Sequence, residues 1–262
     1  MHYENSPLIE LIADVRWGGG ELLQPLRDPI AAMQFQALQS EHEERFMRFG
    51  NRVASEGYSR VERVVPPGAP VPAHQAVYRY RHQDIQNPSL YQLGPQVFTA
   101  NITQPYQSWD SFKPVVAKGL DLFLQTAPQV AGMRGVVTLQ YIDAFGHGLT
   151  AGKSAYEFLQ ELGFGVQVPP VFGKKMSAPR STRMNAAYVF PIAVNTQANI
   201  RVGDGLVQSG PVVMLDTAIH TSDVGLRNVD DIMRVLDAAH DIIHAAFVEM
   251  AKPLEPLMRR KD

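Results

Sequence analysis

The order of the predicted elements constrains the fold of this 262-residue chain more than any single motif does. In the first half, strand-like segments lead into a long helix over residues 108–128, and in the second half further strands lead into a helix over 229–252. This order is typical of an α+β fold, in which long helices pack on one face of antiparallel sheets. We therefore predict two α+β halves, residues 1–146 and 147–262, either as two domains or as one continuous domain. An ancient duplication would explain the shared order, although no repeat is visible residue by residue.

A two-residue period in PLIELIADVRW predicts the first strand. Its apolar side chains alternate with Glu10, Asp14 and Arg16, as in a strand that is buried on one face only. The segment YRYRH alternates in the same way, so both of its tyrosines should lie on one face and both arginines on the other. A Gly-Asp-Gly turn is expected at 203–205. Further strands are expected at residues 76–82, 89–94, 96–102, 134–145, 184–194, 198–203 and 211–220.

Helices are predicted from apolar spacing and from the residues that cap or break them. Residues 29–56 repeat apolar side chains at helical spacing and suggest a pair of amphipathic helices, and a short helix is expected over 154–163. Pro114 fits the first of the two long helices only if the first turn of that helix starts late. Asn228 is placed to cap the last helix and Pro253 to end it.

The composition excludes several classes of function. The chain has no cysteine, which rules out disulfides, thiol nucleophiles and thiolate metal sites and fits a reducing cytoplasm. Its formal charge of −2 and pI near 6.4 provide no bulk positive field for nucleic acid or for an anionic membrane. No apolar run approaches the roughly 20 residues that span a bilayer, and the first residues, MHYENSP, lack the pattern of a secretion signal. We therefore expect a soluble cytoplasmic protein with no membrane partner.

Several segments together resemble a sporadically distributed bacterial family of about this length that has no established activity. They are NSPLIELIADVRW, YQLGPQVFTANITQPYQSWDSF, VVTLQYIDAF, SAYEFLQELG and VVMLDTAIH followed by LDAAHDIIHAAF. The resemblance spans nearly the whole chain and implies a shared fold. It implies no mechanism, because most of the matching positions are apolar, glycine or proline. The residues that carry it are Pro7, Leu8, Glu10, Gly94, Pro95, Asn101, Tyr106, Trp109, Phe112, Tyr141, Ile142, Leu215, Asp216, His240 and Phe247.

This chain departs from that family in the strand at 137–143, where LQYID stands in place of the usual LRYIN. Gln140 and Asp143 thus replace an arginine and an asparagine. The replacement puts in doubt, for this chain, any family activity that depends on those two polar positions. The patchy distribution of the family implies a partner from a neighbouring gene in a mobile or defence-related locus.

The histidines His240 and His244 lie four residues apart in AAHDIIHAAF and raise the question of a zinc site. At about 100° per residue, they fall at and beyond the edge of the apolar stripe of the helix, where such a pair can chelate a metal. A zinc peptidase also needs a longer carboxylate and a third ligand. Asp241 is one methylene too short, and only His220 or Asp216 could supply the third ligand. We favour histidines that border a core helix, and we keep a metal-dependent hydrolase as an alternative.

Two other groups of polar residues are candidate sites. Asp216 has apolar neighbours in VVMLDTAIH, and if its face meets the last helix, its buried charge needs a partner. The family resemblance makes His240 the natural partner, and we predict a hydrogen-bonded structural pair. The loop over 173–183 would suit a phosphate backbone or an acidic partner, although solvated loop charge is the favoured explanation. The basic residues of this loop are Lys174, Lys175, Arg180 and Arg183.

The sequence favours a non-catalytic protein that binds or regulates a macromolecular partner, and a protein partner is expected. It contains no nucleophile elbow, Walker loop or dinucleotide fingerprint, so no cofactor is expected. The metal-dependent hydrolase stays open, as does a small-ligand carrier with Tyr141 and Phe247 lining a pocket between a sheet and the last helix. Nucleic acid remains a partner only through the loop over 173–183. The sequence indicates no oligomeric state.

Overall fold

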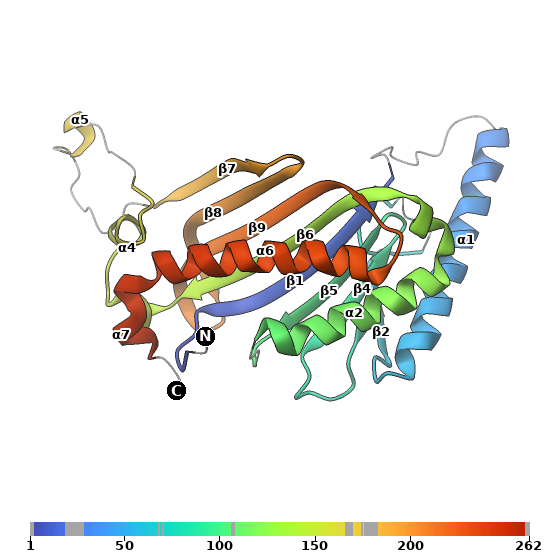
Figure 1. The fold of residues 1–262 in the computed structure, drawn as a ribbon, viewed down its shortest axis with the longest axis horizontal. Helices are drawn as coiled ribbons and strands as arrows, with labels where there is room; N and C mark the ends of the chain where they lie inside the picture. Colours follow the sequence, from blue (N-terminus) through green and yellow to red (C-terminus); the bar gives the residue numbers. More distant parts are fainter. Residues whose placement is uncertain are drawn as a thin grey trace. The chain divides into compact units, whose positions relative to one another are not determined.

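A computed structural model describes most of the chain as a mixed α+β fold (Figure 1). It describes residues 3–18, 29–67, 69, 71–105, 108–165, 170–173, 175 and 183–259, without the side chains of 29–39 and 172–173. The described residues form nine strands in one sheet, in the order β2-β3-β4-β5-β1-β6-β9-β8-β7. The predicted α+β class is therefore confirmed. The finer prediction, that long helices cover one face of the whole sheet, stays a prediction.

The elements follow the predicted order closely. The strands are β1 (Leu8–Trp17), β2 (Arg60–Arg63), β3 (Tyr78–Arg81), β4 (Ser89–Gly94), β5 (Val97–Thr103), β6 (Arg134–Phe145), β7 (Asn185–Ala193), β8 (Thr196–Val207) and β9 (Gly210–Gly225). The main helices are α1 (Pro29–Ala54), α2 (Trp109–Thr126), α4 (Ala155–Glu161) and α6 (Val229–Met250). Short helices are η1 (Pro128–Gly132), α3 (His147–Thr150), α5 (Pro170–Gly173), η3 (Lys252–Leu254) and α7 (Glu255–Met258). None of the helices in the described ranges has the length and apolar character needed to cross a membrane.

The chain divides into two compact units that are interleaved along the sequence. Unit 1 comprises Met1–Glu10, Gln140–Ile219 and Ala239–Asp262, and unit 2 comprises Leu11–Leu139 and His220–Ala238. The elements β1, β6, β9 and α6 contribute residues to both units. The linear halves predicted from the sequence, and their duplication, stay predictions.

Unit 2 has an aromatic layer between its strands and the helices α1 and α2. Antiparallel pairing places Val61, Tyr80, Tyr91 and Ala100 directly opposite one another across β2–β5. The Tyr80 hydroxyl donates a 2.8 Å hydrogen bond to the carbonyl of Phe46 in α1, and Tyr91 donates one of 2.8 Å to a carbonyl of α2. Because both phenols are buried and bonded to helix backbone, they fix the two helices on this face of β3 and β4.

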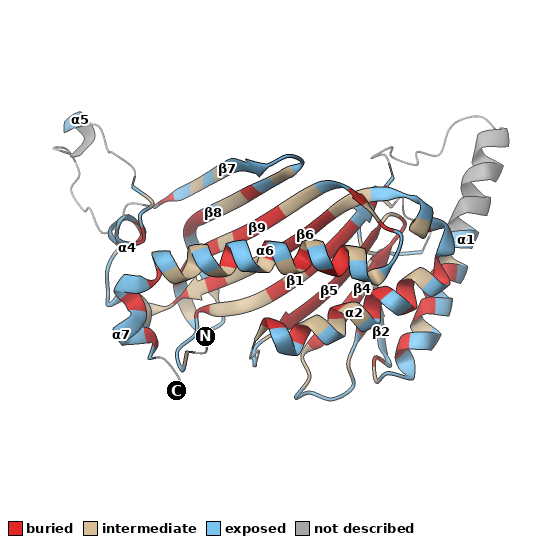
Figure 2. Cartoon of the chain, viewed as in Figure 1, coloured by how far each residue is buried: buried red, intermediate tan, exposed pale blue. Residues whose placement is uncertain are grey.

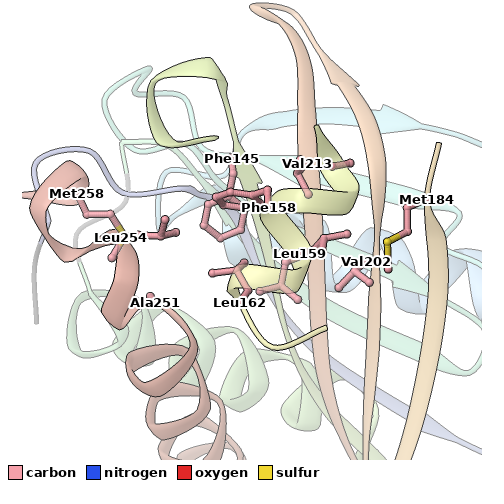
Figure 3. Close-up of a cluster of buried hydrophobic side chains, with 12 residues drawn as sticks. Phe145, Phe158, Leu159, Leu162, Met184, Val202, Val213, Ala251, Leu254 and Met258 are labelled. Atoms are coloured by element: carbon pink, nitrogen blue, oxygen red, sulfur yellow. The ribbon is translucent and has the colours of Figure 1, made fainter. Parts of the chain in front are cut away.

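Unit 1 has its own apolar core, built by strands, α4 and the carboxy-terminal turns of helix (Figure 3). Phe145 at the end of β6 packs against Phe158 of α4, with ring centroids 5.1 Å apart. Leu254 and Met258 close the cluster from η3 and α7. The short helix predicted over 154–163 therefore has a clear role, because it supplies the centre of this core. The remaining members of the cluster are Ala155, Leu159, Leu162, Met184, Val202, Val213, Leu215 and Ala251.

Local signals in the sequence set the starts of the helices. The Asn228 side chain accepts a 2.9 Å hydrogen bond from the backbone N–H of Asp231, which confirms it as the cap of α6. Ser108 caps α2 through a capping box. Because α2 begins at Trp109, Pro114 lies inside the helix, and the prediction of a late first turn is wrong.

Two further predictions need correction, and one strand was missed. Residues 29–54 form one continuous helix rather than a pair, because proline does not interrupt α1 after its first residue. The expected turn at 203–205 is absent from the described chain, since β8 runs straight through it. Both positions lack room for a side chain. A Cβ at Gly203 would lie 2.6 Å from the carbonyl oxygen of Met184, and one at Gly205 would overlap Met214. Strand β2 was not predicted, because its four residues, RVER, show no apolar alternation.

Gly119 in α2 leads to the first testable prediction. A Cβ at this position would overlap the ring of Tyr91, which is buried and bonded to α2. We expect Gly119→Ala to destabilise the protein by about 1–3 kcal/mol through overpacking, although alanine normally stabilises a helix by about 1 kcal/mol relative to glycine. Urea unfolding measures the difference.

Gly148→Ala is the matched control, because Gly148 is also helical and a Cβ there meets nothing within 4 Å. We expect this variant to be as stable as the parent or slightly more so. Equal stability of the Gly119→Ala variant and the parent would contradict the tight approach of α2 to Tyr91.

Candidate functional site

A row of polar side chains crosses unit 2 on the face opposite the aromatic layer. Glu62 lies directly opposite Arg79, Arg79 opposite Gln92, and Gln92 opposite Thr99. The Thr99 hydroxyl donates a 3.4 Å hydrogen bond to Oδ2 of Asp14 on β1. Because each of the three middle residues directly adjoins a residue of the aromatic layer along its strand, their side chains point to the other face. We call Glu62, Arg79, Gln92, Thr99 and Asp14, with Thr138 and His220 described below, the polar row.

Hydrogen bonds connect the side chains of this row across strands. The Nε of Arg79 donates to Oε1 of Gln92 at 2.9 Å, and Nε2 of Gln92 donates to Oδ1 of Asn101 at 3.1 Å. The guanidinium groups of Arg79 and Arg81 lie 3.9 and 3.7 Å from the carboxylate of Glu62. These contacts hold donors and acceptors in fixed positions on the sheet surface. They also confirm that the arginines and tyrosines of YRYRH point to opposite faces.

The row continues onto β6 and β9. The Thr138 hydroxyl and Nδ1 of His220 lie 2.8 Å apart in a hydrogen bond whose direction depends on the histidine tautomer. Asp14 interacts electrostatically with His220. Within unit 2 the polar row therefore contains side chains from seven strands, β2–β5, β1, β6 and β9.

Asp14 is a buried carboxyl group in the row. Its exposed fraction is only 8%, and burial raises the pKa of its carboxyl group. The Arg16 guanidinium, whose Nε lies 2.7 Å from Oδ1 of Asp14, acts in the opposite direction, as do Thr99 and His220. Burial outweighs these contacts. A buried carboxyl group is costly to keep, and perturbed carboxyl groups of this kind are enriched at functional sites.

In unit 1 the hydrogen bonds of Asp216 and His240 go to neighbouring residues of β6. Nε2 of Gln140 donates a 2.7 Å bond to Oδ1 of Asp216, and the Tyr141 hydroxyl lies 2.7 Å from Nδ1 of His240. Neighbours along a strand point to opposite faces. The predicted direct bond between Asp216 and His240 stays a prediction.

The two histidines of α6 lie beside each other, as their spacing predicts. The rings of His240 and His244 stack with centroids 5.5 Å apart and planes 21° apart, and both residues are partly buried. Burial lowers the pKa of His244. In the described part of the chain, no three His, Asp or Glu side chains are gathered closely enough to hold a metal ion. The metal alternative, with His240, His244 and His220, thus has no assembled ligand set among the described residues.

The predicted basic loop is only partly described. Lys175 and Arg183 are exposed, and Lys174 and Arg180 lie outside the described residues. Its role in partner or phosphate binding stays a prediction. Tyr141 bonds to His240, and Phe247 packs against the core of unit 1, so both proposed pocket-lining side chains have protein partners.

Comparison with known proteins identifies no relative: no family model, curated protein or solved structure matches this chain. The resemblance to the sporadic bacterial family therefore rests on the sequence segments quoted for it.

Asp143 leads to the second testable prediction. This residue of β6 is 4% exposed, and burial raises the pKa of its carboxyl group to about 7. A raised pKa in the folded state means that the fold favours the protonated form. The contribution to stability is therefore fully present below the unfolded pKa near 4, declines as the pH rises, and is lost above about pH 7.

Asp143→Asn removes this charge while keeping the shape of the side chain. At about 1.4 kcal/mol per pKa unit, we expect the variant to exceed the parent in stability by a few kcal/mol at pH 8 and by much less at pH 4. Chemical unfolding at both pH values measures the difference. The idea fails if the gap between the two proteins does not change with pH.

Proposed function

We propose that this protein is a non-catalytic binding or regulatory protein and that the polar row of unit 2 contacts a protein partner. The observation that supports the proposal most strongly is the alignment of polar side chains across seven strands, with buried Asp14 among them. Interfaces use fixed hydrogen-bonding groups of this kind to set orientation and specificity. A face kept only for solubility has no need of a buried carboxyl group.

Arginines on this face favour a partner with an acidic surface. Arg60 lies directly opposite Arg81, one row away from the Glu62–Arg79 pair and on the same face. Arg60, Arg81 and Arg16 are exposed, and Arg79 is partly so. Arginine presents a planar fork of donors that suits carboxylates and is enriched at protein interfaces. In this proposal the protein acts in the cytoplasm, and a neighbouring gene encodes the partner.

Charge reversal on the polar row provides the third prediction. We expect Arg79→Glu combined with Arg81→Glu to abolish capture of the partner by the tagged protein in its native host, because two negative charges would replace two positive ones opposite an acidic surface. Mass spectrometry identifies the captured protein, and the parent protein should retain it in a fixed stoichiometry. Raising the salt concentration should weaken the interaction.

Arg48→Glu is the matched control, because Arg48 is an exposed arginine of α1 whose nearby carboxylate is that of Glu44. We expect this variant to capture the partner normally. Thermal unfolding must show that the double variant is folded. Equal capture by the parent and by a folded double variant would refute the role of the polar row.

A further inference from the structure

Strand β7 lies at one end of the strand order of the sheet. Its residues pair with β8 in antiparallel register, from Asn185 opposite Gly203 to Ala193 opposite Thr196. On its other side, β7 has no strand partner within the described part of the chain. A strand in this position presents a row of backbone N–H and C=O groups that can pair with another strand.

The two end strands of the sheet differ sharply in chemistry. The other end strand, β2, has four residues, and Arg60, Glu62 and Arg63 are charged. Short length and charge are the usual protection of a sheet edge against unwanted pairing. Strand β7 has nine residues, NAAYVFPIA, without a charge, and only Pro191 is of a protective type. This edge therefore lacks most of the protection that β2 has.

Apolar side chains are exposed on both faces of β7. Val189 is 61% exposed and Phe190 46%, and these neighbours point to opposite faces of the strand. Tyr188 shares the face of Phe190, and their rings stack with centroids 6.1 Å apart and planes 8° apart. Figure 2 shows that exposure continues along most of the strand and into the turn to β8. Exposed apolar side chains gathered on one element are typical of an interaction surface.

We propose that β7 pairs antiparallel with β7 of a second copy of this chain, around a two-fold axis at Val189. In this register, Tyr188 lies opposite Phe190 of the second copy, and Ala187 lies opposite Pro191. The pairs formed by residues 186–192 are all apolar, and the aromatic pairs are of a kind that stabilises sheets. Because β7 carries no charge, two identical strands do not repel each other. The two-fold arrangement is closed, so it uses up both exposed edges at once.

This inference goes beyond the proposed function and rests on a different surface. The polar row belongs to unit 2, and β7 belongs to unit 1. If β7 does not form a dimer, the polar row can still capture a partner. If the polar row captures no partner, β7 can still form a dimer.

The absence of cysteine from the chain makes a direct test possible, because any disulfide must involve introduced residues. We expect Val189→Cys to form a reducible dimer under mild oxidation. Val61→Cys is the matched control, since Val61 is a similarly exposed valine on β2, and it should form no disulfide cross-link.

A second pair of variants tests the register. Asn185 of one copy should lie opposite Ala193 of the other, whereas the two copies of Asn185 should lie about 26 Å apart, at about 3.3 Å per residue. We expect a mixture of Asn185→Cys and Ala193→Cys proteins to form a disulfide cross-link between the two variants. Each variant alone should form no cross-link. Cross-linking of Asn185→Cys alone, without the mixed product, would overturn the register.

Light scattering on the cysteine-free protein gives the independent readout. We expect the unmodified chain to form a dimer as its concentration rises, and Phe190→Lys to shift that equilibrium to monomer. Val61→Lys should dimerise like the parent. A parent that stays monomeric at every concentration, together with no cross-link in Val189→Cys, would overturn the proposal.

Discussion

The register of the antiparallel strands β2–β5 is the constraint on which the rest of unit 2 depends. Successive side chains of a strand point to opposite faces, so one register sorts two chemically different rows. Tyr80 and Tyr91 reach the backbone of α1 and α2, while Arg79 and Gln92 join the polar row. A slip of one residue would drive an arginine into the aromatic layer. Packing of the core therefore also fixes the geometry of the polar row.

Asp14 and Asp143 are both buried, but the surroundings of their carboxyl groups differ. Asp14 keeps Arg16 and Thr99 as partners, and its place in the polar row gives its carboxyl group neighbours on two other strands, Thr99 on β5 and His220 on β9. Burial is the one cause that raises the pKa of Asp143. The first group is part of a hydrogen-bonded network that specifies an arrangement, whereas the second adds a pH-dependent cost to the core of unit 1. Asp143 is thus expected to make the stability of unit 1 depend on pH.

The sequence predicted most elements, because their signals are local. Alternation located β1 and β3, and the cap at Asn228 located the start of α6. The prediction of a turn at 203–205 was wrong. The glycines there leave room for close contacts with Met184 and Met214, and the local sequence does not reveal those contacts. The polar row was missed for a related reason. Each strand showed a polar residue in alternation, but the row appears only when residues as distant as Asp14 and Thr99 are placed in register.

The same rule explains why β7 differs from the strands of unit 2. Register is specified where one face is apolar and the other polar, because a slip then buries polar groups. Apolar side chains on both faces of β7 weaken that penalty, and its pairing with β8 shifts between Pro191 and Ala193. Its outer edge is thus defined by backbone groups and apolar surface rather than by charge. In the two proposals, β7 pairs with a second copy through symmetry and shape, whereas the polar row binds a partner through placed donors and acceptors. The two proposed surfaces therefore favour different kinds of partner.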